Sequence, residues 1–130
     1  MKPFKLACIQ LGDPTSNKYE NLNRALNLIQ EAATNGAQLV CLPEYACLRE
    51  TKKEAIQADA EDFGCSPTTD FSTYDVQQSS SILLQRLSKA AQTAKVWLFA
   101  GSYPEKAGDK VYNTMPVVRS SFWKIASILK

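Results

Sequence analysis

The chain has 130 residues, of which 45% are hydrophobic, and its 15 basic and 13 acidic residues give a net charge of +2. This length suits one globular domain with a substantial core, and the small, interspersed charge argues against nucleic-acid and membrane partners. Histidine is absent, which excludes Ser-His-Asp and Cys-His nucleophile systems and any metal site built on imidazole.

The first predicted unit is a strand, a helix and a second strand over residues 5–42. The apolar run at 5–11 predicts a strand that is buried on both faces. Asn17, with Glu20 three residues later, matches a capping box, and apolar residues at helical spacing follow until an Asn-Gly pair closes the helix. A strand over 38–42 completes the unit, and we expect the two strands to be parallel.

The rest of the chain predicts a second helix-strand pair. Residues 49–61 favour a short helix, and the Gly-, Ser-, Thr- and Asp-rich stretch that follows reads as a surface loop. A helix is predicted from Ser79, and a buried strand at 96–100. After a loop at 106–110, residues 111–118 should return as an antiparallel neighbour.

Glu44 is the first candidate for chemistry. The apolar run Leu39 to Leu42 predicts a buried strand, and Pro43, which cannot donate to a ladder, stops it. Ligands of open α/β sheets gather beyond the carboxyl ends of strands, where a carboxylate can exchange protons with a substrate. The apolar strand behind it predicts low-dielectric surroundings. The alternative is that Glu44 only caps a loop or pairs with a lysine.

The cysteines lie at positions 8, 41, 47 and 65, without zinc-ligand or Cys-x-x-Cys spacing. Cys8 and Cys41 fall within apolar runs, so we expect reduced thiols and no disulfide framework, and we interpret Cys41 as a core residue rather than a nucleophile. The apolar segment at 6–9 is too short for a signal-peptide core or a membrane span. We therefore expect an intracellular, cytoplasmic protein; a mitochondrial location stays open.

Five separate segments form an ordered series along the chain. They are Leu6-Ala-Cys-Ile-Gln10, Glu31-Ala-Ala-Thr-Asn-Gly-Ala37, Leu42-Pro-Glu44, Ala100-Gly-Ser-Tyr-Pro-Glu105 and Val111-Tyr-Asn-Thr114. In this order and approximate spacing they resemble the nitrilase, or carbon-nitrogen hydrolase, superfamily, and within it the omega-amidase branch. The resemblance covers about residues 4–118. It implies an α/β fold, here a partial α-β-β-α sandwich, that forms homo-oligomers across its helical faces.

The resemblance also implies a chemistry that needs no histidine, no metal and no organic cofactor. A cysteine thiolate attacks the carbon of a small amide substrate, a glutamate moves protons, and a lysine ammonium stabilises the oxyanion before water resolves the thioester. Glu44 matches the position of the general base.

The other two members of this triad are harder to place. The local pattern Phe122-Trp-Lys-Ile125 makes Lys124 a candidate for the lysine, but only eleven residues separate it from Tyr112, too few for the usual hairpin. All four cysteines precede this region, so none matches the nucleophile. We therefore interpret residues 1–118 as the N-terminal portion of the hydrolase domain, truncated before the nucleophile and inactive alone.

The tail, residues 119–130, looks unrelated to the family. Phe122, Ile125 and Leu129 would share a helical face, which could cover a bare sheet edge or lie exposed, and of these two we expect the exposed segment. The alternative to an amidase is a non-catalytic variant that binds a full-length subunit through the helix at 18–35. A cysteine downstream of residue 118 would distinguish the two.

Three lesser sets of candidate residues have structural alternatives. Glu105 ends another predicted strand, and we interpret it as a loop carboxylate. Tyr45 and Tyr103 could line a substrate pocket or simply pack beside strand ends. Asn113-Thr114 serves backbone hydrogen bonding at a strand start, although the resemblance also hints at a supporting shell around the base.

Overall fold

The structure is a computed structural model that describes residues 2–48, 52–66, 68–70, 72–119 and 125–129. Its elements in chain order are β1 (Leu6–Cys8), α1 (Lys18–Thr34), β2 (Leu39–Cys41), α2 (Lys53–Asp59), the 3₁₀ turn η1 (Val76–Gln78), α3 (Ile82–Ala94), β3 (Trp97–Phe99), β4 (Tyr103–Ala107), β5 (Lys110–Val118) and β6 (Ile125–Leu129). None of the helices in these ranges is long and apolar enough to span a membrane.

Helix α1 begins where the sequence predicts it, but a third side chain joins the capping box. The Asn17 side chain accepts hydrogen bonds from the backbone N–H groups of Tyr19 and Glu20, at 3.0 and 3.3 Å. The Thr15 hydroxyl accepts the N–H of Asn17 at 3.2 Å and donates to the Glu20 carboxylate at 3.0 Å. Thr15 thus bridges the two ends of the predicted box and helps to satisfy the first turn.

The sheet has the strand order β1-β2-β3-β5-β4, with β6 paired to β5. Strands β1, β2 and β3 are parallel, which confirms the predicted strand-helix-strand unit, and β5 returns antiparallel to β3 as predicted. Strand β4 was not predicted. It forms a hairpin with β5 around a turn at 108–109, so the predicted loop at 106–110 is too long. The local sequence does not predict this strand, because it contains Pro104, Glu105 and Lys106, and proline, glutamate and lysine are depleted in strands.

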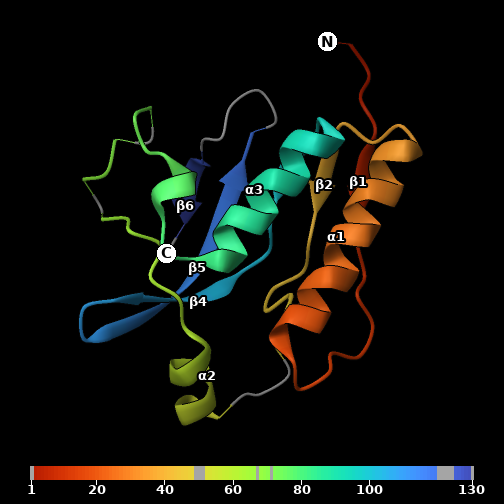
Figure 1. Ribbon diagram of the computed structural model, residues 1–130. Helices are drawn as coiled ribbons and strands as arrows, with labels where there is room; N and C mark the ends of the chain where they lie inside the picture. Colours follow the sequence, from red (N-terminus) through yellow and green to blue (C-terminus); the bar gives the residue numbers. More distant parts are fainter. Residues whose placement is uncertain (1, 49–51, 67, 71, 120–124, 130) are drawn as a thin grey trace.

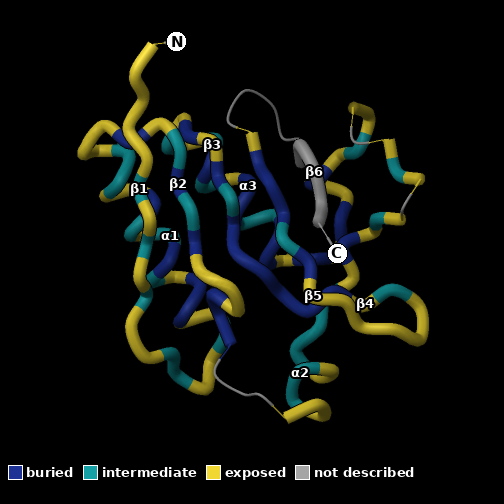
Figure 2. Tube along the Cα trace, turned by 180° about the vertical axis from the view of Figure 1, so that it is seen from behind, coloured by how far each residue is buried: buried dark blue, intermediate teal, exposed yellow. Residues whose placement is uncertain are grey.

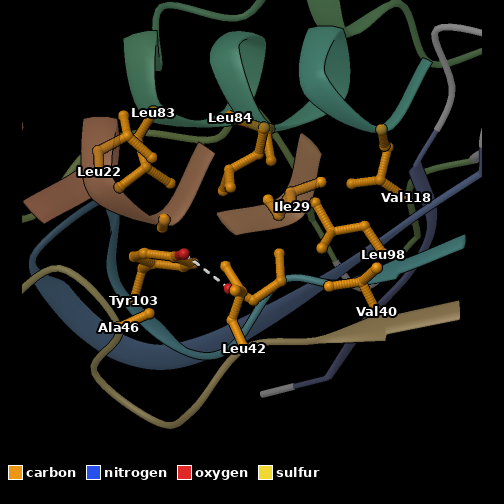
Figure 3. Close-up of a cluster of buried hydrophobic side chains, with 14 of the residues drawn as sticks. Leu22, Ile29, Val40, Leu42, Ala46, Leu83, Leu84, Leu98, Tyr103 and Val118 are labelled. Carbon is orange, nitrogen blue, oxygen red and sulfur yellow. Dashed lines mark hydrogen bonds between the residues drawn. The ribbon is translucent and has the colours of Figure 1, made fainter. Parts of the chain in front are cut away.

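One face of the sheet is covered by helices α1 and α3, which lie side by side (Figure 1). Figure 3 shows the buried side chains between the two helices and the strands. They include Leu22 and Ile29 of α1, Leu83, Leu84 and Leu87 of α3, and Val40, Leu98 and Val118 of the strands. Because strand side chains alternate between faces, the middle residues of β2 and β3, Val40 and Leu98, enter this core while the residues on either side of them are less buried.

The other face of the sheet, seen in Figure 2, carries no helix from the described residues. Leu6 is 49% exposed and Trp97 40% exposed. The prediction that the first strand is buried on both faces is therefore wrong, because β1 is the outer strand and one of its faces lacks a second layer. The chain therefore has an α/β fold with one helical layer and one sheet layer, which confirms the predicted partial α-β-β-α sandwich.

Residues 125–129 of the tail form strand β6, antiparallel to β5. The predicted helical face of Phe122, Ile125 and Leu129 is therefore wrong; Phe122 itself lies outside the described residues. Pairing with β5 satisfies backbone groups along the side of that strand that β3 leaves open, which favours a strand over an isolated helical turn. This pairing supports the alternative in which the tail covers a sheet edge, and not the exposed segment that we expect from the sequence.

Candidate active site

Glu44 lies just beyond the carboxyl end of β2, as predicted, and its side chain is exposed. The Leu42 N–H still donates to the Phe99 carbonyl at 2.9 Å, and Pro43 then ends the ladder because it has no N–H. A cavity of about 410 Å³ lies beside this corner. Its walls are formed by Gln10, Leu11, Gly12, Asp13, Pro14, Pro43, Glu44, Tyr45, Ala46 and Leu48. The ends of two parallel strands thus meet at a place where a ligand can reach the carboxylate.

The exposure of Glu44 differs from one expectation. The apolar strand lies behind the residue, but the described residues do not enclose its carboxylate in low-dielectric surroundings. An apolar strand in the sequence predicts what is packed behind a strand end, and it says nothing of what covers the side chain in front.

One side-chain hydrogen bond joins Glu44 to a distant part of the chain. The Asn113 Nδ2 atom donates to Glu44 Oε1 at 2.8 Å. The neighbouring Thr114 is buried, and its hydroxyl donates to Glu105 Oε2 at 2.6 Å. The structure therefore separates the two residues of the Asn-Thr pair, because Asn113 reaches the candidate base while Thr114 binds a carboxylate in the interior. Glu105 is fully buried within β4, so its interpretation as a loop carboxylate is wrong.

The backbone around Glu44 contacts the corner that follows β3. Tyr45 has a φ of +48°, and its N–H donates to the Ser102 hydroxyl at 3.2 Å. Gly101 has a φ of +74°, and a Cβ there would lie only 2.1 Å from the Pro43 carbonyl oxygen. Sequence reasoning missed both corner residues as members of the site. The signal was available, because β2 and β3 are parallel neighbours whose carboxyl ends meet at one edge.

The two tyrosine candidates have different surroundings. Tyr45 lines both the cavity beside Glu44 and a neighbouring groove of about 560 Å³. The other residues of that groove are Lys53, Ile56, Gln57, Pro104, Asp109, Lys110, Val111, Tyr112 and Asn113. Tyr103 is buried, its hydroxyl donates to the Ala100 carbonyl at 2.6 Å, and burial raises its pKa well above the usual range. Tyr45 can therefore meet a ligand, whereas Tyr103 belongs to the core.

The four cysteines are free thiols. Burial raises the pKa of Cys47 to about 11, and burial followed by the neighbouring Cys8 raises that of Cys41. A raised pKa disfavours the thiolate that a nucleophile needs. No cysteine lines the cavity at Glu44 among the described residues, and Lys124 lies outside them. Across the same residues, no three His, Cys, Asp or Glu side chains group closely enough to hold a metal ion.

The chain matches the carbon-nitrogen hydrolase family over residues 5–121. Omega-amidase NIT2 of Mus musculus is 35% identical over 117 residues, which are 90% of this chain and 36% of that protein. Nitrilase homolog 2 of Dictyostelium discoideum is 38% identical over 117 residues, 87% of this chain and 30% of that protein. The chain thus spans about a third of the length of these relatives.

Solved structures show the same fold. A member of branch 10 of the nitrilase superfamily from Saccharomyces cerevisiae superposes with a TM-score of 0.72 at 26% identity, over 93% of this chain and 41% of that chain. A carbon-nitrogen hydrolase superfamily protein from Xanthomonas campestris gives a TM-score of 0.71 at 16% identity, over 99% of this chain and 40% of that one. At this lower identity, the likeness concerns the fold alone.

Proposed function

Because the chain belongs to the carbon-nitrogen hydrolase family, we propose that it carries Glu44 as the general base of an amidase that hydrolyses the non-peptide C–N bond of small omega-amides. The observation that supports this most is the place of Glu44, an exposed carboxylate at the end of a parallel strand, on the wall of a cavity and bound by Asn113. The similarity to omega-amidases supports the substrate class.

In the proposed reaction, Glu44 takes the proton of a cysteine thiol, and the thiolate sulfur forms a bond to the amide carbon. A lysine ammonium, for which Lys124 is the candidate, stabilises the charge on the amide oxygen. The C–N bond then breaks, Glu44 gives its proton to the leaving nitrogen, which departs as ammonia, and a thioester is left. Water gives a proton to Glu44 and its oxygen bonds to the thioester carbon; the C–S bond then breaks, the carboxylic acid leaves, and Glu44 returns the proton to the thiolate sulfur.

We further propose that the nucleophile is none of the four cysteines of this chain. Cys47 is buried with a raised pKa, Cys41 also has a raised pKa, and no cysteine is among the described residues that line the cavity at Glu44. The 130-residue chain by itself should therefore release no ammonia from short omega-amides. Ammonia release that Glu44→Gln abolishes would contradict this statement while supporting Glu44 as the base.

A chimera tests the role of Glu44 directly. Residues 5–118 of this chain would replace the matching segment of omega-amidase NIT2 from Mus musculus, and ammonia release from omega-amides would be measured. Glu44→Gln should lower kcat by about 10²- to 10⁴-fold, the usual contribution of a general base. Glu54→Gln, at an exposed position in the first turn of α2, is the matched control and should leave kcat unchanged. A kcat within threefold of the parent chimera for Glu44→Gln would contradict the assignment.

A second candidate function is that of a non-catalytic chain that binds a full-length family subunit. A groove of about 550 Å³ between α1 and α3 favours it. The groove is lined by Leu26, Gln30, Gln77, Gln85, Arg86, Lys89, Ala90 and Thr93. Co-elution with the Mus musculus relative in size-exclusion chromatography, weakened by Leu26→Asp, would support this function. Separate elution at micromolar concentrations would contradict it.

A further inference from the structure

The backbone at the Glu44 corner has a conformation that few residues adopt. Tyr45, which follows Glu44 directly, has a φ of +48°. A residue with a Cβ is disfavoured in this left-handed region, and such residues gather where the surrounding contacts force them and where function needs them. The contacts that hold Tyr45 therefore also decide where the Glu44 side chain starts.

Two of these contacts come from the corner that follows β3. The Ser102 side chain is buried, and its hydroxyl accepts the Tyr45 N–H at 3.2 Å. The absence of a side chain at Gly101 lets the two backbones approach, since a Cβ there would lie 2.1 Å from the Pro43 carbonyl oxygen. The peptide units on both sides of Glu44 are thus in contact with residues 101–102.

A third contact holds the carboxylate itself. In the part of the chain that the structure describes, Asn113 is the one residue whose side chain hydrogen-bonds the Glu44 carboxylate, and it engages Oε1 at 2.8 Å. Asn113 is fixed in turn by its neighbour, because the bond between Thr114 and Glu105 sets β5 against β4 in the interior. The position of the exposed Asn113 side chain is thereby set by the buried hydrogen bond between Thr114 and Glu105.

We propose that Asn113 and Ser102 are positioning residues for Glu44. Asn113 binds one carboxylate oxygen and leaves the other to exchange a proton with the thiol or the leaving ammonia, and Ser102 holds the peptide unit that sets the side chain's direction. This inference rests on the proposed function, since it assigns a purpose to the orientation of Glu44. The hydrogen bonds themselves can be tested without any turnover.

The Asn113 bond can be tested by NMR on the 130-residue chain. The side-chain amide protons of Asn113 should shift with pH as the Glu44 carboxylate ionises, because their acceptor gains or loses its charge. Glu44→Gln should abolish this pH dependence, and Val111→Thr, at an exposed position two residues away on β5, should preserve it. Asn113 amide protons that do not respond to pH, or that still respond in Glu44→Gln, would overturn the role of Asn113.

The Ser102 bond can be tested by hydrogen exchange. Ser102→Ala should speed exchange of the Tyr45 amide by about three- to tenfold, the effect expected when one hydrogen bond is lost. Ser102→Thr keeps the hydroxyl and should restore slow exchange. Ser80→Ala removes a hydroxyl that binds Asp62 elsewhere and serves as the control. An unchanged Tyr45 rate in Ser102→Ala would overturn the role of Ser102.

The chimera separates this inference from the proposed function. Asn113→Leu should lower kcat by about tenfold or more with KM within twofold, because a misaimed base slows the chemical step rather than binding. If Glu44→Gln loses hydrolysis while Asn113→Leu keeps the full kcat, the amidase assignment stands and the positioning role is wrong. If the Asn113 amide follows Glu44 but Glu44→Gln keeps full hydrolysis, the proposed function is wrong.

Discussion

Two glutamates of this molecule lie at the ends of secondary-structure elements, yet their surroundings are opposite. Glu61 lies two residues after the end of α2, and its side chain, which is 14% exposed, contacts the start of α3. It forms an ion pair with Lys18 at 2.8 Å and accepts hydrogen bonds from the Ser81 hydroxyl at 2.7 Å and the Leu83 N–H at 3.1 Å. Both carboxylate oxygens of Glu61 are occupied, and the residue connects α1 to the start of α3.

Glu44 is exposed, and within the described ranges its carboxylate accepts one side-chain hydrogen bond, from the neutral amide of Asn113. A carboxylate bound by several donors holds structure and resists protonation, whereas one with a free oxygen in a cavity can exchange a proton with a ligand. Within the described residues, the number of donors around a carboxylate therefore separates the structural glutamate from the candidate base.

The largest expected effect on stability is that of Glu61→Ala. The substitution removes the carboxylate that pairs with Lys18 and accepts two donors at the start of α3, so that Lys18 keeps its hydrogen bond to the Asp59 carbonyl at 2.9 Å but loses its ion pair. We expect it to lower the free energy of unfolding by about 3 kcal/mol. Glu44→Ala should change it by less than about 1 kcal/mol, as for other surface positions. Urea unfolding followed by circular dichroism measures both. Equal losses for the two variants would contradict the separation.

Gly101→Ala should have an effect of similar size, because it disturbs the close backbone contact behind Glu44. A left-handed backbone with a Cβ costs about 1–2 kcal/mol, and the clash with the Pro43 oxygen adds to this, so we expect a loss of about 3 kcal/mol. Gly12 is the matched control, since its φ is +69° and a Cβ there would meet nothing within 4 Å. Gly12→Ala isolates the backbone cost. Losses that differ by less than the error of the urea titration would show that the close approach is unimportant.

The pH dependence of stability should follow Glu61. Burial alone would raise its pKa, but the hydrogen bonds from Lys18, Ser81 and Leu83 outweigh burial and hold the pKa below the ordinary value of 4.5. A lowered folded-state pKa stabilises the protein fully above the unfolded value, and this stability is lost as pH falls through the folded value. We therefore expect the free energy of unfolding to decrease below about pH 4.5, with a smaller decrease in Glu61→Gln. An identical pH profile for the variant would contradict this.

The local elements could be predicted from the sequence because their signals are local. The cap at Asn17, the apolar face of α1 and the run before Pro43 placed the strand-helix-strand unit and put Glu44 at a strand end. Strand β4 could not be predicted in this way, because Pro104 and its charged neighbours form a strand only through pairing with β5. The same holds for β6, whose partner strand decides its conformation.

In the candidate site, too, the sequence predicted what depends on local signals and not what depends on contacts between distant residues. Glu44 was found from its position after an apolar run, and five ordered segments identified the family. The contacts that hold it join residues 57 and 69 positions apart, Tyr45 to Ser102 and Glu44 to Asn113. Such contacts depend on the register between β2, β3 and β5, which no local pattern encodes. Exposure could not be predicted either, since it depends on the layers that surround the strand end.

The smallest expected change in the free energy of unfolding concerns two buried serines, Ser81 and Ser88, at the start and within α3. Like the two glutamates, they differ in the number of their hydrogen-bond partners. The Ser81 hydroxyl donates to Glu61 and accepts the Leu84 N–H at 3.0 Å as the helix cap, whereas the buried Ser88 hydroxyl has no hydrogen-bond partner within the described residues. Ser81→Ala should lower the free energy of unfolding by about 1–2 kcal/mol. Ser88→Ala should raise it by about 0.5–1 kcal/mol, because alanine removes an unsatisfied polar group and favours the helix. Thermal and urea unfolding measure the change in the free energy of unfolding for each variant. A loss of stability in Ser88→Ala would contradict the prediction and show that this hydroxyl has a partner in solution.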